Sequence, residues 1–205
     1  MTRVKQLYAQ RLTARRITPD PAQAEAVERL DALAKALSAS RGWFGGGAKP
    51  RGLYIWGKVG RGKSMLMDLF YETVPVAKKR RTHFHVFMGE IHRLIDVWRK
   101  GDAATRKARF GAIKGDDPIG PVADVVAAEA RLLCFDEFQV TDIADAMILG
   151  RLFEALFARG VTLVATSNRM PEALYRDGIN RQLFLPFIDL LKTRVEVVSV
   201  AGQHD

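Results

Sequence analysis

Short apolar runs alternate with longer amphipathic segments along most of the chain. Apolar or alternating runs predict strands at 52–56, 82–87, 131–138, 161–166 and 195–200. Residues at helical spacing predict helices at about 63–73, 89–99, 121–130, 143–158 and 181–191. Because strands that alternate with helices assemble into covered parallel sheets, the pattern predicts an α/β fold. We expect a five-stranded parallel sheet with helices on both faces.

Two further helices are predicted before this alternation, at 1–17 and at about 21–38. Asp20 is a suitable N-cap for the second helix and Pro21 a suitable first residue. A glycine-rich linker at 41–50 follows. We therefore expect residues 1–50 to form an N-terminal helical extension with its linker, and residues 51–205 to form the core.

Two polar stretches inside the core predict surface loops. The basic run 78–81 precedes the second predicted strand and favours a solvated loop, with a contact to an anionic partner as the alternative. Residues 100–118 are polar and contain several glycines, which favours a loop with a helical turn.

The segment between the first predicted strand and the next helix carries the clearest chemistry. It fits the pattern G-x-x-x-x-G-K-[ST] at every fixed position, in the strand–loop–helix setting that a phosphate-binding loop requires. Its glycines let backbone N–H groups approach phosphate oxygens, the lysine supplies a positive charge and the serine a hydroxyl ligand for Mg²⁺. The predicted nucleotide contacts are Gly57, Lys58, Val59, Gly60, Arg61, Gly62, Lys63, Ser64 and Met65.

Polar residues lie at the ends of the third and fourth predicted strands. The apolar run of the third strand ends in Asp136 and Glu137, where Asp136 is expected to hold Mg²⁺ together with Ser64, and Glu137 to orient the attacking water. Asn168 follows the next strand and is expected to contact the γ-phosphate or that water. The alternative for Asn168 is to cap the short helix that starts at Pro171.

The amino-acid composition limits the classes of binding partner but does not identify one of them. The 205 residues carry a net charge of +9, which favours polyanions such as nucleotide, nucleic acid, an acidic protein or a membrane surface. The single cysteine, Cys134, lies in an apolar run and indicates a core thiol in a reducing compartment. No apolar stretch is long enough to span a membrane, and no secretory signal is recognised.

Phosphate loop, Asp-Glu and a polar residue on the next strand, in this order, resemble the AAA+ ATPases. The resemblance implies an arginine that reaches the nucleotide of a neighbouring subunit and stabilises charge on the transferring phosphate. Such a residue is expected between the last two strands. Arg181 fits best, Arg169 and Arg176 are rivals, and a surface role in solubility is the alternative for each.

Sequence blocks narrow the resemblance to the ZapE cell-division ATPases and their mitochondrial AFG-like relatives. These blocks are 17–23, 84–88, 134–147, 165–169 and 180–188. The resemblance spans almost the whole chain, and the block around Asp136 is the most specific. It implies an ATP- and Mg²⁺-dependent ATPase that acts as a homo-oligomer, with Gln23 near the adenine base. It also implies either a bacterial cytoplasmic protein, acting at the division ring or the inner face of the membrane, or a mitochondrial quality-control factor.

One departure from the family concerns the end of the sequence. The chain stops just after its last predicted strand, where family members continue. We therefore expect the helical lid, with its second sensor arginine, to be absent. Three functional hypotheses follow: an ATPase that remodels a protein partner, a nucleic-acid module such as a helicase loader that uses ATP as a switch, and a chain that binds nucleotide without turning it over.

Two smaller groups invite functional readings. His83, His85 and His92 suggest a metal site, and His83 and His85 are expected on one strand face. No cysteine or carboxylate is spaced to complete such a site, so a metal other than Mg²⁺ is not predicted. The segment 87–89 resembles an aromatic pore loop, although core packing followed by a turn is favoured.

Overall fold

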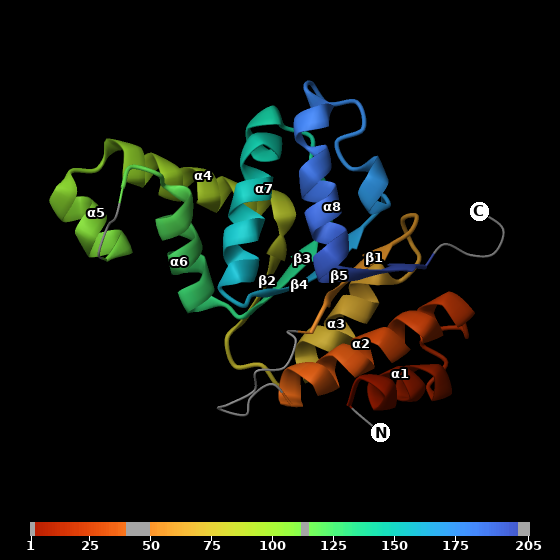
Figure 1. Ribbon diagram of the computed structural model, residues 1–205. Coiled ribbons are helices and arrows are strands. Elements are labelled where there is room, and N and C mark those ends of the chain that lie inside the picture. The colour runs from red at the N-terminus through yellow and green to blue at the C-terminus, as the bar shows by residue number, and fades with distance from the viewer. Residues whose placement is uncertain (1–2, 40–49, 112–114, 201–205) are drawn as a thin grey trace.

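The computed structural model describes residues 3–39, 50–111 and 115–200. Within these residues, five strands form one parallel sheet in the order β2-β3-β4-β1-β5, as Figure 1 shows. The strands are β1 (Gly52–Trp56), β2 (Lys79–His83), β3 (Leu132–Asp136), β4 (Thr162–Ser167) and β5 (Val195–Ser199). The predicted parallel α/β sheet is confirmed, and the ends of β1, β3 and β4 lie side by side.

Helices cover both faces of the sheet (Figure 1). One face packs against α2 (Pro21–Ala39) and α3 (Lys63–Thr73), and α1 (Arg3–Thr13) packs on these two helices. The other packs against α4 (Phe84–Lys100), α6 (Ile119–Glu129), α7 (Ile143–Ala158) and α8 (Leu185–Arg194), with α5 (Ala103–Phe110) beside α6. Short 3₁₀ turns, η1 (Pro171–Ala173) and η2 (Arg181–Leu183), connect β4 to α8.

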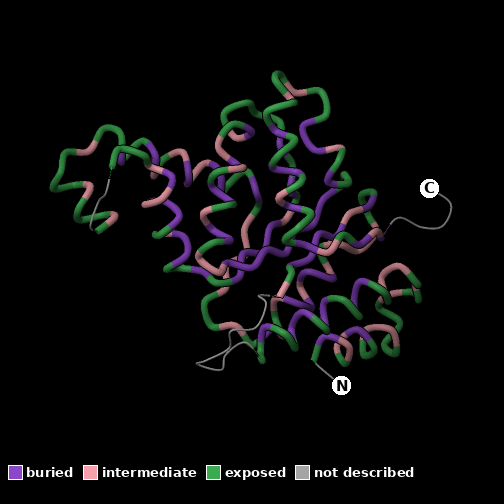
Figure 2. Tube along the Cα trace, viewed as in Figure 1, coloured by how far each residue is buried: buried purple, intermediate pink, exposed green. Residues whose placement is uncertain are grey.

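Alternate residues of β1, β3, β4 and β5 enter two separate cores. Figure 2 shows the buried parts of the chain. On β3, Leu133 and Phe135 face α4 and α7, whereas Leu132 and Cys134 face α3. Asp136 lies two residues after Cys134, so it lies on the same face as α3. This register directs the last carboxylate of β3 toward the helix that follows the phosphate loop.

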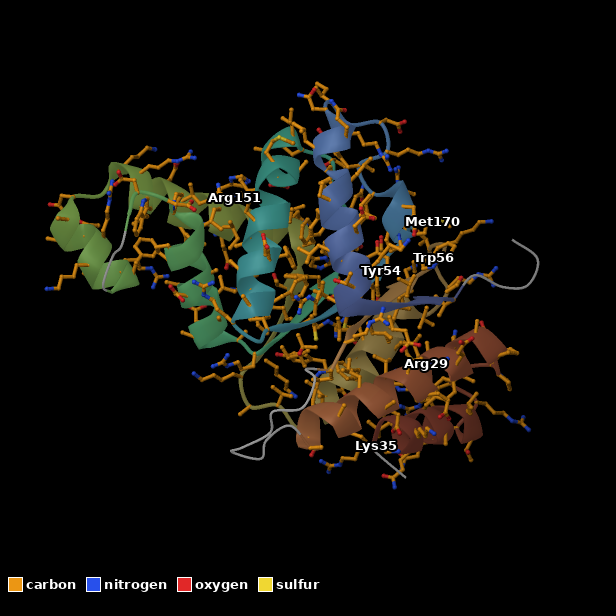
Figure 3. The ribbon with its side chains drawn as sticks, viewed as in Figure 1. Arg29, Lys35, Tyr54, Trp56, Arg151 and Met170 are labelled. Atoms are coloured by element: carbon orange, nitrogen blue, oxygen red, sulfur yellow. The ribbon has the colours of Figure 1, made fainter. Side chains whose placement is uncertain are left out.

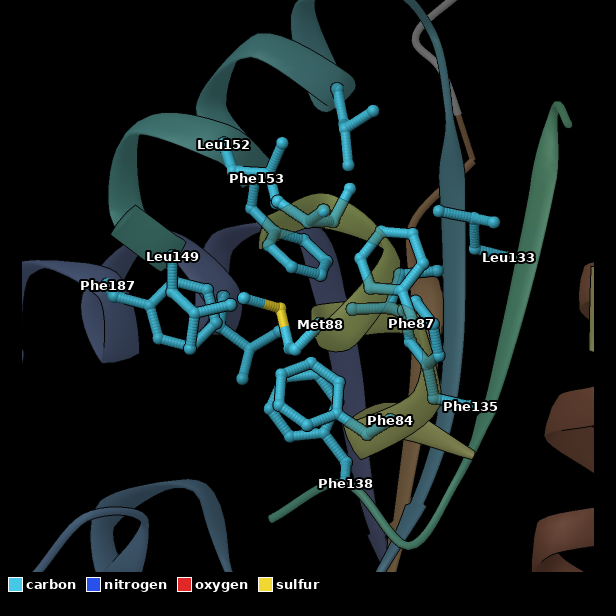
Figure 4. Close-up of a cluster of buried hydrophobic side chains, with 14 of the residues drawn as sticks. Phe84, Phe87, Met88, Leu133, Phe135, Phe138, Leu149, Leu152, Phe153 and Phe187 are labelled. Carbon is cyan, nitrogen blue, oxygen red and sulfur yellow. The ribbon is translucent and has the colours of Figure 1, made fainter. Parts of the chain in front are cut away.

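Aromatic side chains dominate the larger core (Figure 4). The ring centroids of Phe84 and Phe138 are 4.1 Å apart, and Phe138 also stacks on Phe187 at 6.3 Å. Full burial of a phenylalanine stabilises a fold by about 3–5 kcal/mol, judged from the cost of truncating it to alanine. Phe138 follows Glu137 directly, so this cluster anchors the segment after β3.

The structure around β2 differs from the sequence prediction. The strand expected at 82–87 is wrong: β2 is Lys79–His83, and α4 begins at Phe84. The basic run expected as a solvated loop forms most of the strand. The alternation of histidine and apolar residues fits a strand, but Phe84, Phe87, Met88 and Ile91 also recur at helical spacing and are buried.

Segment 87–89 therefore belongs to α4, where Phe87 and Met88 are buried in the core. The pore-loop reading is wrong for this arrangement. Core packing is confirmed, but the turn expected after it is not, because the helix continues to Lys100.

Other boundaries agree or shift modestly. Helices α3 and α7 have the predicted bounds, and Asp142 caps α7 by accepting from the backbone N–H of Ala144. The expected loop at 100–118 contains the helix α5, and the helix expected at 181–191 divides into η2 and α8. The linker predicted at 41–50 lies outside the described residues except for Pro50. In the described part of the chain, no helix has both the length and the apolar character needed to cross a membrane.

Candidate functional site

The loop from Gly57 to Ser64 connects β1 to α3. Gly60 and Gly62 adopt φ values of 82° and 80°, a region that glycine enters without steric cost. Helix α3 begins at Lys63, with Gly62 as its N-cap. The unpaired N–H groups of the first helical turn therefore adjoin the loop, which is the arrangement that favours phosphate.

Lys63 folds back over this loop. Its ammonium Nζ donates to the carbonyl oxygens of Gly57 at 2.6 Å and Lys58 at 2.7 Å. Burial lowers the pKa of Lys63, and the negative charge of Glu137 partly offsets that effect. The ammonium of Lys63 thus lies against the loop, where it can counter phosphate charge.

Gln23, at the start of α2, lies against the loop from the other side. Its Nε2 donates to the carbonyl oxygen of Arg61 at 3.2 Å. Its Oε1 is buried and has no hydrogen-bond partner among the described residues. Asp20 holds this end of α2 by accepting from the backbone N–H of Ala22 at 2.9 Å, which agrees with its predicted cap role.

Asp136 ends β3 in an ion pair with Arg81 of β2. The guanidinium donates from Nε to Oδ2 at 2.7 Å and from Nη2 to Oδ1 at 3.1 Å. Its third nitrogen, Nη1, contacts Asp68 on α3. Because Asp68 is one helical turn after Ser64, the face of α3 that carries Ser64 is turned toward Asp136.

Glu137 leaves the sheet with a left-handed backbone. Its φ is 54°, an uncommon value for a residue other than glycine, and such conformations cluster at functional sites. Its backbone N–H donates to Thr166 Oγ1 at 3.4 Å, and the next N–H, of Phe138, donates to the Thr166 carbonyl at 2.7 Å. The side chain of Glu137 is 71% exposed, and its Oε2 lies 4.0 Å from Nδ1 of His83.

Asn168 follows β4 and is exposed at the same edge. The turn that carries it is fixed by Ser167, whose Oγ donates to the Phe138 carbonyl at 2.8 Å and accepts from Arg169 N–H at 3.1 Å. Tyr54 donates its hydroxyl to the Arg169 carbonyl at 2.9 Å, and burial raises the pKa of that phenol. Figure 3 labels Tyr54, on β1, and Met170, which follows Arg169. Met170 is the N-cap of η1, so the alternative of Asn168 capping that turn is wrong.

Of the candidate arginines, Arg169 lies in this turn, and Arg176 and Arg181 lie beyond it. Arg181 is half-buried, and its Nη2 donates to the carbonyl oxygen of Glu172 at 2.7 Å. Its Nε is buried without a hydrogen-bond partner among the described residues. Arg169 and Arg176 are exposed.

The histidines are arranged differently from the prediction. His83 ends β2, whereas His85 lies in α4, so the expected shared strand face is wrong. Their ring centroids are 5.7 Å apart. Nε2 of His92 lies 2.7 Å from Asp145 Oδ1. Among the described residues, no three histidine, cysteine or carboxylate side chains are grouped as metal ligands.

Sequence reasoning missed three residues that shape this edge. The sequence predicts a solvated loop for the basic run that contains Arg81, and it predicts no role for Thr166, at the end of the strand 161–166, or for Ser167 after it. A hydroxyl at each of two consecutive positions in a fully buried strand is the signal that could have found the last two, since buried polar groups need partners. The pairing of Arg81 with Asp136 joins residues 55 positions apart, and no local pattern reports it.

The oxygen ligands fit Mg²⁺. Ser64 supplies an exposed hydroxyl at the start of α3, and Asp136 supplies a carboxylate whose side chain is 14% exposed. Hydroxyl and carboxylate oxygens, completed by water and phosphate, are the usual surroundings of this ion. The orphaned Oε1 of Gln23 offers an acceptor to a base bearing an amino group.

Comparison with known proteins decides the family. The sequence profile of the AFG1-like ATPases matches residues 1–205. The chain belongs to this family. ZapE, a cell division protein of Escherichia coli K12, is 43% identical over 207 residues, covering 91% of this chain and 51% of ZapE. Lactation elevated protein 1 homolog B of Danio rerio is 54% identical over 151 residues, covering 74% of this chain and 29% of that protein. This AFG1-like chain thus spans about half the length of ZapE, and less of the fish protein.

Solved structures support the fold of this AFG1-like chain. DnaI matches with a TM-score of 0.56 at 13% identity, over 89% of this chain and 87% of that chain. AMPPCP-bound DnaA from Aquifex aeolicus matches with a TM-score of 0.56 at 15% identity, over 89% of this chain and 48% of that chain. At these identities the likeness shows the fold alone, which is the AAA+ type of P-loop fold.

Proposed function

We propose that this chain binds ATP with Mg²⁺ at the shared edge of β1, β3 and β4 and hydrolyses it. The observation that carries the proposal is that backbone hydrogen bonds tie these three strand ends together. Gly57 N–H donates to the Ser167 carbonyl at 3.2 Å, and Phe138 N–H donates to the Thr166 carbonyl at 2.7 Å. The phosphate loop, the carboxylates and the polar turn therefore share one side of the molecule.

Each residue at this edge has a role that its geometry supports. The loop N–H groups and Lys63 bind the phosphates, Ser64 and Asp136 hold Mg²⁺, and Gln23 contacts the base. The Mg²⁺ ion, when bound, neutralises charge that develops on the phosphate oxygens. Glu137 orients the attacking water and accepts its proton, for which its exposed carboxylate is available.

Asn168 supplies a neutral hydrogen-bonding group beside the water without adding negative charge. Arg181 is proposed to act on the nucleotide of a neighbouring copy, which makes the active form a homo-oligomer. Its hydrogen bond from Nη2 to the Glu172 carbonyl orients the guanidinium within its own chain.

Replacing Glu137 with Gln tests the chemistry. The variant is expected to bind ATP with wild-type affinity and to lose hydrolysis by about 100-fold or more, because an amide cannot accept the proton. Nucleotide binding by fluorescence and phosphate release measure the two effects. Gln139→Glu, two residues along and exposed, is the control for a changed charge. Undiminished hydrolysis in Glu137→Gln would remove Glu137 from the mechanism.

The partner is proposed from the relative named as a cell division protein. We propose that this chain takes part in the remodelling of a protein of the division ring. In that role it works in the bacterial cytoplasm, at the division site or the inner face of the membrane. ATP-dependent change in the length of division-ring polymers tests this, with Glu137→Gln as the matched inactive protein.

Binding to nucleic acid is the second candidate, and the net charge of +9 favours it. Basic side chains on α5 add a local reason, since Lys107 and Arg109 are exposed and that helix carries no acidic residue. Binding to single-stranded DNA that weakens steeply with salt would support this function. Absence of binding at low salt would end it.

A further inference from the structure

Arg81 joins three parts of the proposed site. Its guanidinium makes the two-point contact with Asp136 on β3 and a third contact with Asp68 on α3. Asp68 and Ser64 share one face of α3, because four residues separate them. Arg81 therefore lies beside the two residues proposed to hold Mg²⁺, although β2 itself contributes no part of the phosphate loop.

The ion pair is partly shielded from water. The side chains of Arg81 and Asp136 are 22% and 14% exposed. Burial lowers the pKa of Arg81, but hydrogen bonds and charges from Asp136 and Asp68 outweigh burial and raise the pKa above its ordinary value. The guanidinium is thus a permanent positive charge between two carboxylates. Its planar fork fixes the orientation of Asp136 in a way that a lysine ammonium could not.

The contact with Arg81 weakens the attraction of Asp136 for a metal ion. Each of its oxygens already accepts one hydrogen bond, and its charge is shared with a neighbouring cation. A carboxylate in this state keeps lone pairs for a water molecule but attracts a bare ion less strongly. Without Arg81, Asp68 and Asp136 would be two uncompensated carboxylates, a combination that attracts divalent cations.

We propose that Arg81 is a positioning residue with two effects. It aims Asp136 at water bound to the metal, and it prevents Asp68 and Asp136 from taking up a divalent cation before nucleotide arrives. The first effect rests on the proposed ATPase function. The second concerns the nucleotide-free protein and stands apart from hydrolysis.

Mn²⁺ binding to nucleotide-free protein, followed by electron paramagnetic resonance, tests the second effect. Arg81→Gln is expected to bind Mn²⁺ about tenfold or more tightly than wild type, since the compensating charge is gone. Arg80→Gln is the matched control: it removes a neighbouring arginine of β2 that pairs instead with Glu90 and Glu129. Adding Asp136→Asn to Arg81→Gln should abolish the gain. A folded Arg81→Gln protein with wild-type Mn²⁺ affinity overturns this effect.

Arg81→Lys tests the first effect and serves if Arg81→Gln fails to fold. It keeps the charge but loses the two-point contact, so Mn²⁺ affinity is expected to stay at the wild-type level. The kcat for ATP is expected to fall about tenfold with KM nearly unchanged, because an interaction of the transition state is lost. Wild-type kcat in Arg81→Lys overturns the aiming role, as does a rise in KM alone. If the wild-type protein hydrolyses no ATP, the proposed function fails, while the Mn²⁺ comparison still decides the second effect.

Discussion

The backbone N–H of Phe138 donates to the carbonyl oxygen of Thr166 at 2.7 Å, one residue after the proposed catalytic glutamate. This bond links the segment after β3 to the end of β4. The hydroxyl of Thr166 is also within 3.4 Å of the Glu137 N–H and 3.5 Å of the Phe135 carbonyl. Thr166 thus contacts the backbone on both sides of the left-handed Glu137: the Phe135 carbonyl before it and the Phe138 N–H after it.

Replacing Thr166 with Val is expected to destabilise the protein by about 1–2 kcal/mol, because the buried Phe135 carbonyl and the partly buried Glu137 N–H lose a partner. It should also lower kcat more than it raises KM, since Glu137 loses its backbone support. Urea unfolding and steady-state kinetics measure these effects. Thr162→Val at the start of β4, which is also buried, is the control and should leave kcat unchanged. Equal effects of the two substitutions would contradict the role given to Thr166.

Glu137→Gly is expected to stabilise the folded protein by about 1 kcal/mol, because glycine adopts a positive φ without the steric cost that a side chain carries. Hydrolysis should be lost at the same time, as expected where an active site stores strain. Thermal unfolding monitored by circular dichroism measures the gain. Gln139→Gly, at a position without positive φ, should destabilise instead. A loss of stability in Glu137→Gly would show that the turn carries no strain.

The lowered pKa of Lys63 predicts that the stability of the folded protein depends on pH. Because burial holds its folded pKa below 10.5, the unfolded chain binds more protons at this group in the window beneath that value. The contribution of Lys63 to stability should therefore rise as the pH rises through this window. Lys63→Met removes the group, so the difference in unfolding midpoint between wild type and variant should grow with pH. A constant difference in nucleotide-free protein would contradict the prediction.

Gln23→Leu tests the proposed contact with the base. If Oε1 of Gln23 accepts from an adenine amino group, wild type should bind ATP about tenfold more tightly than inosine triphosphate, which lacks that group. The variant should bind both nucleotides alike. Competition against a fluorescent ATP analogue measures the ratio, and Gln10→Leu on the exposed face of α1 is the control. An unchanged ratio in Gln23→Leu would place the base elsewhere.

The sequence predicts best where the signal is local. The segment from β1 through the phosphate loop to α3 was predicted at its observed bounds, because the glycines, the apolar strand and the helix formers lie within one continuous stretch. Helix α7 was predicted equally well from its cap at Asp142 and its 3.6-residue period. Asp136, Glu137 and Asn168 follow adjacent strands, so the parallel order of the sheet suffices to bring them to one edge.

The prediction from sequence fails at β2, where ion pairs and hydrogen bonds, and not the burial of apolar side chains, stabilise the strand. The residues of β2 are stabilised by ion pairs and hydrogen bonds to carboxylates and carbonyls, as with Arg80 and Lys79, and none of its residues is fully buried. A pattern that seeks apolar strands passes over such a segment and selects the neighbouring Phe84 and Phe87 instead. The left-handed backbone of Glu137 could not be predicted either, because a glutamate does not require a positive φ.

The basic composition of β2 has a consequence for solubility. Within the described residues β2 pairs only with β3, so its outer row of backbone groups is a free sheet edge that could template pairing with another chain. Edge strands that carry lysine and arginine resist such pairing, because two copies would bring like charges together. The strand that supplies Arg81 to Asp136 therefore also protects the sheet against edge-to-edge aggregation.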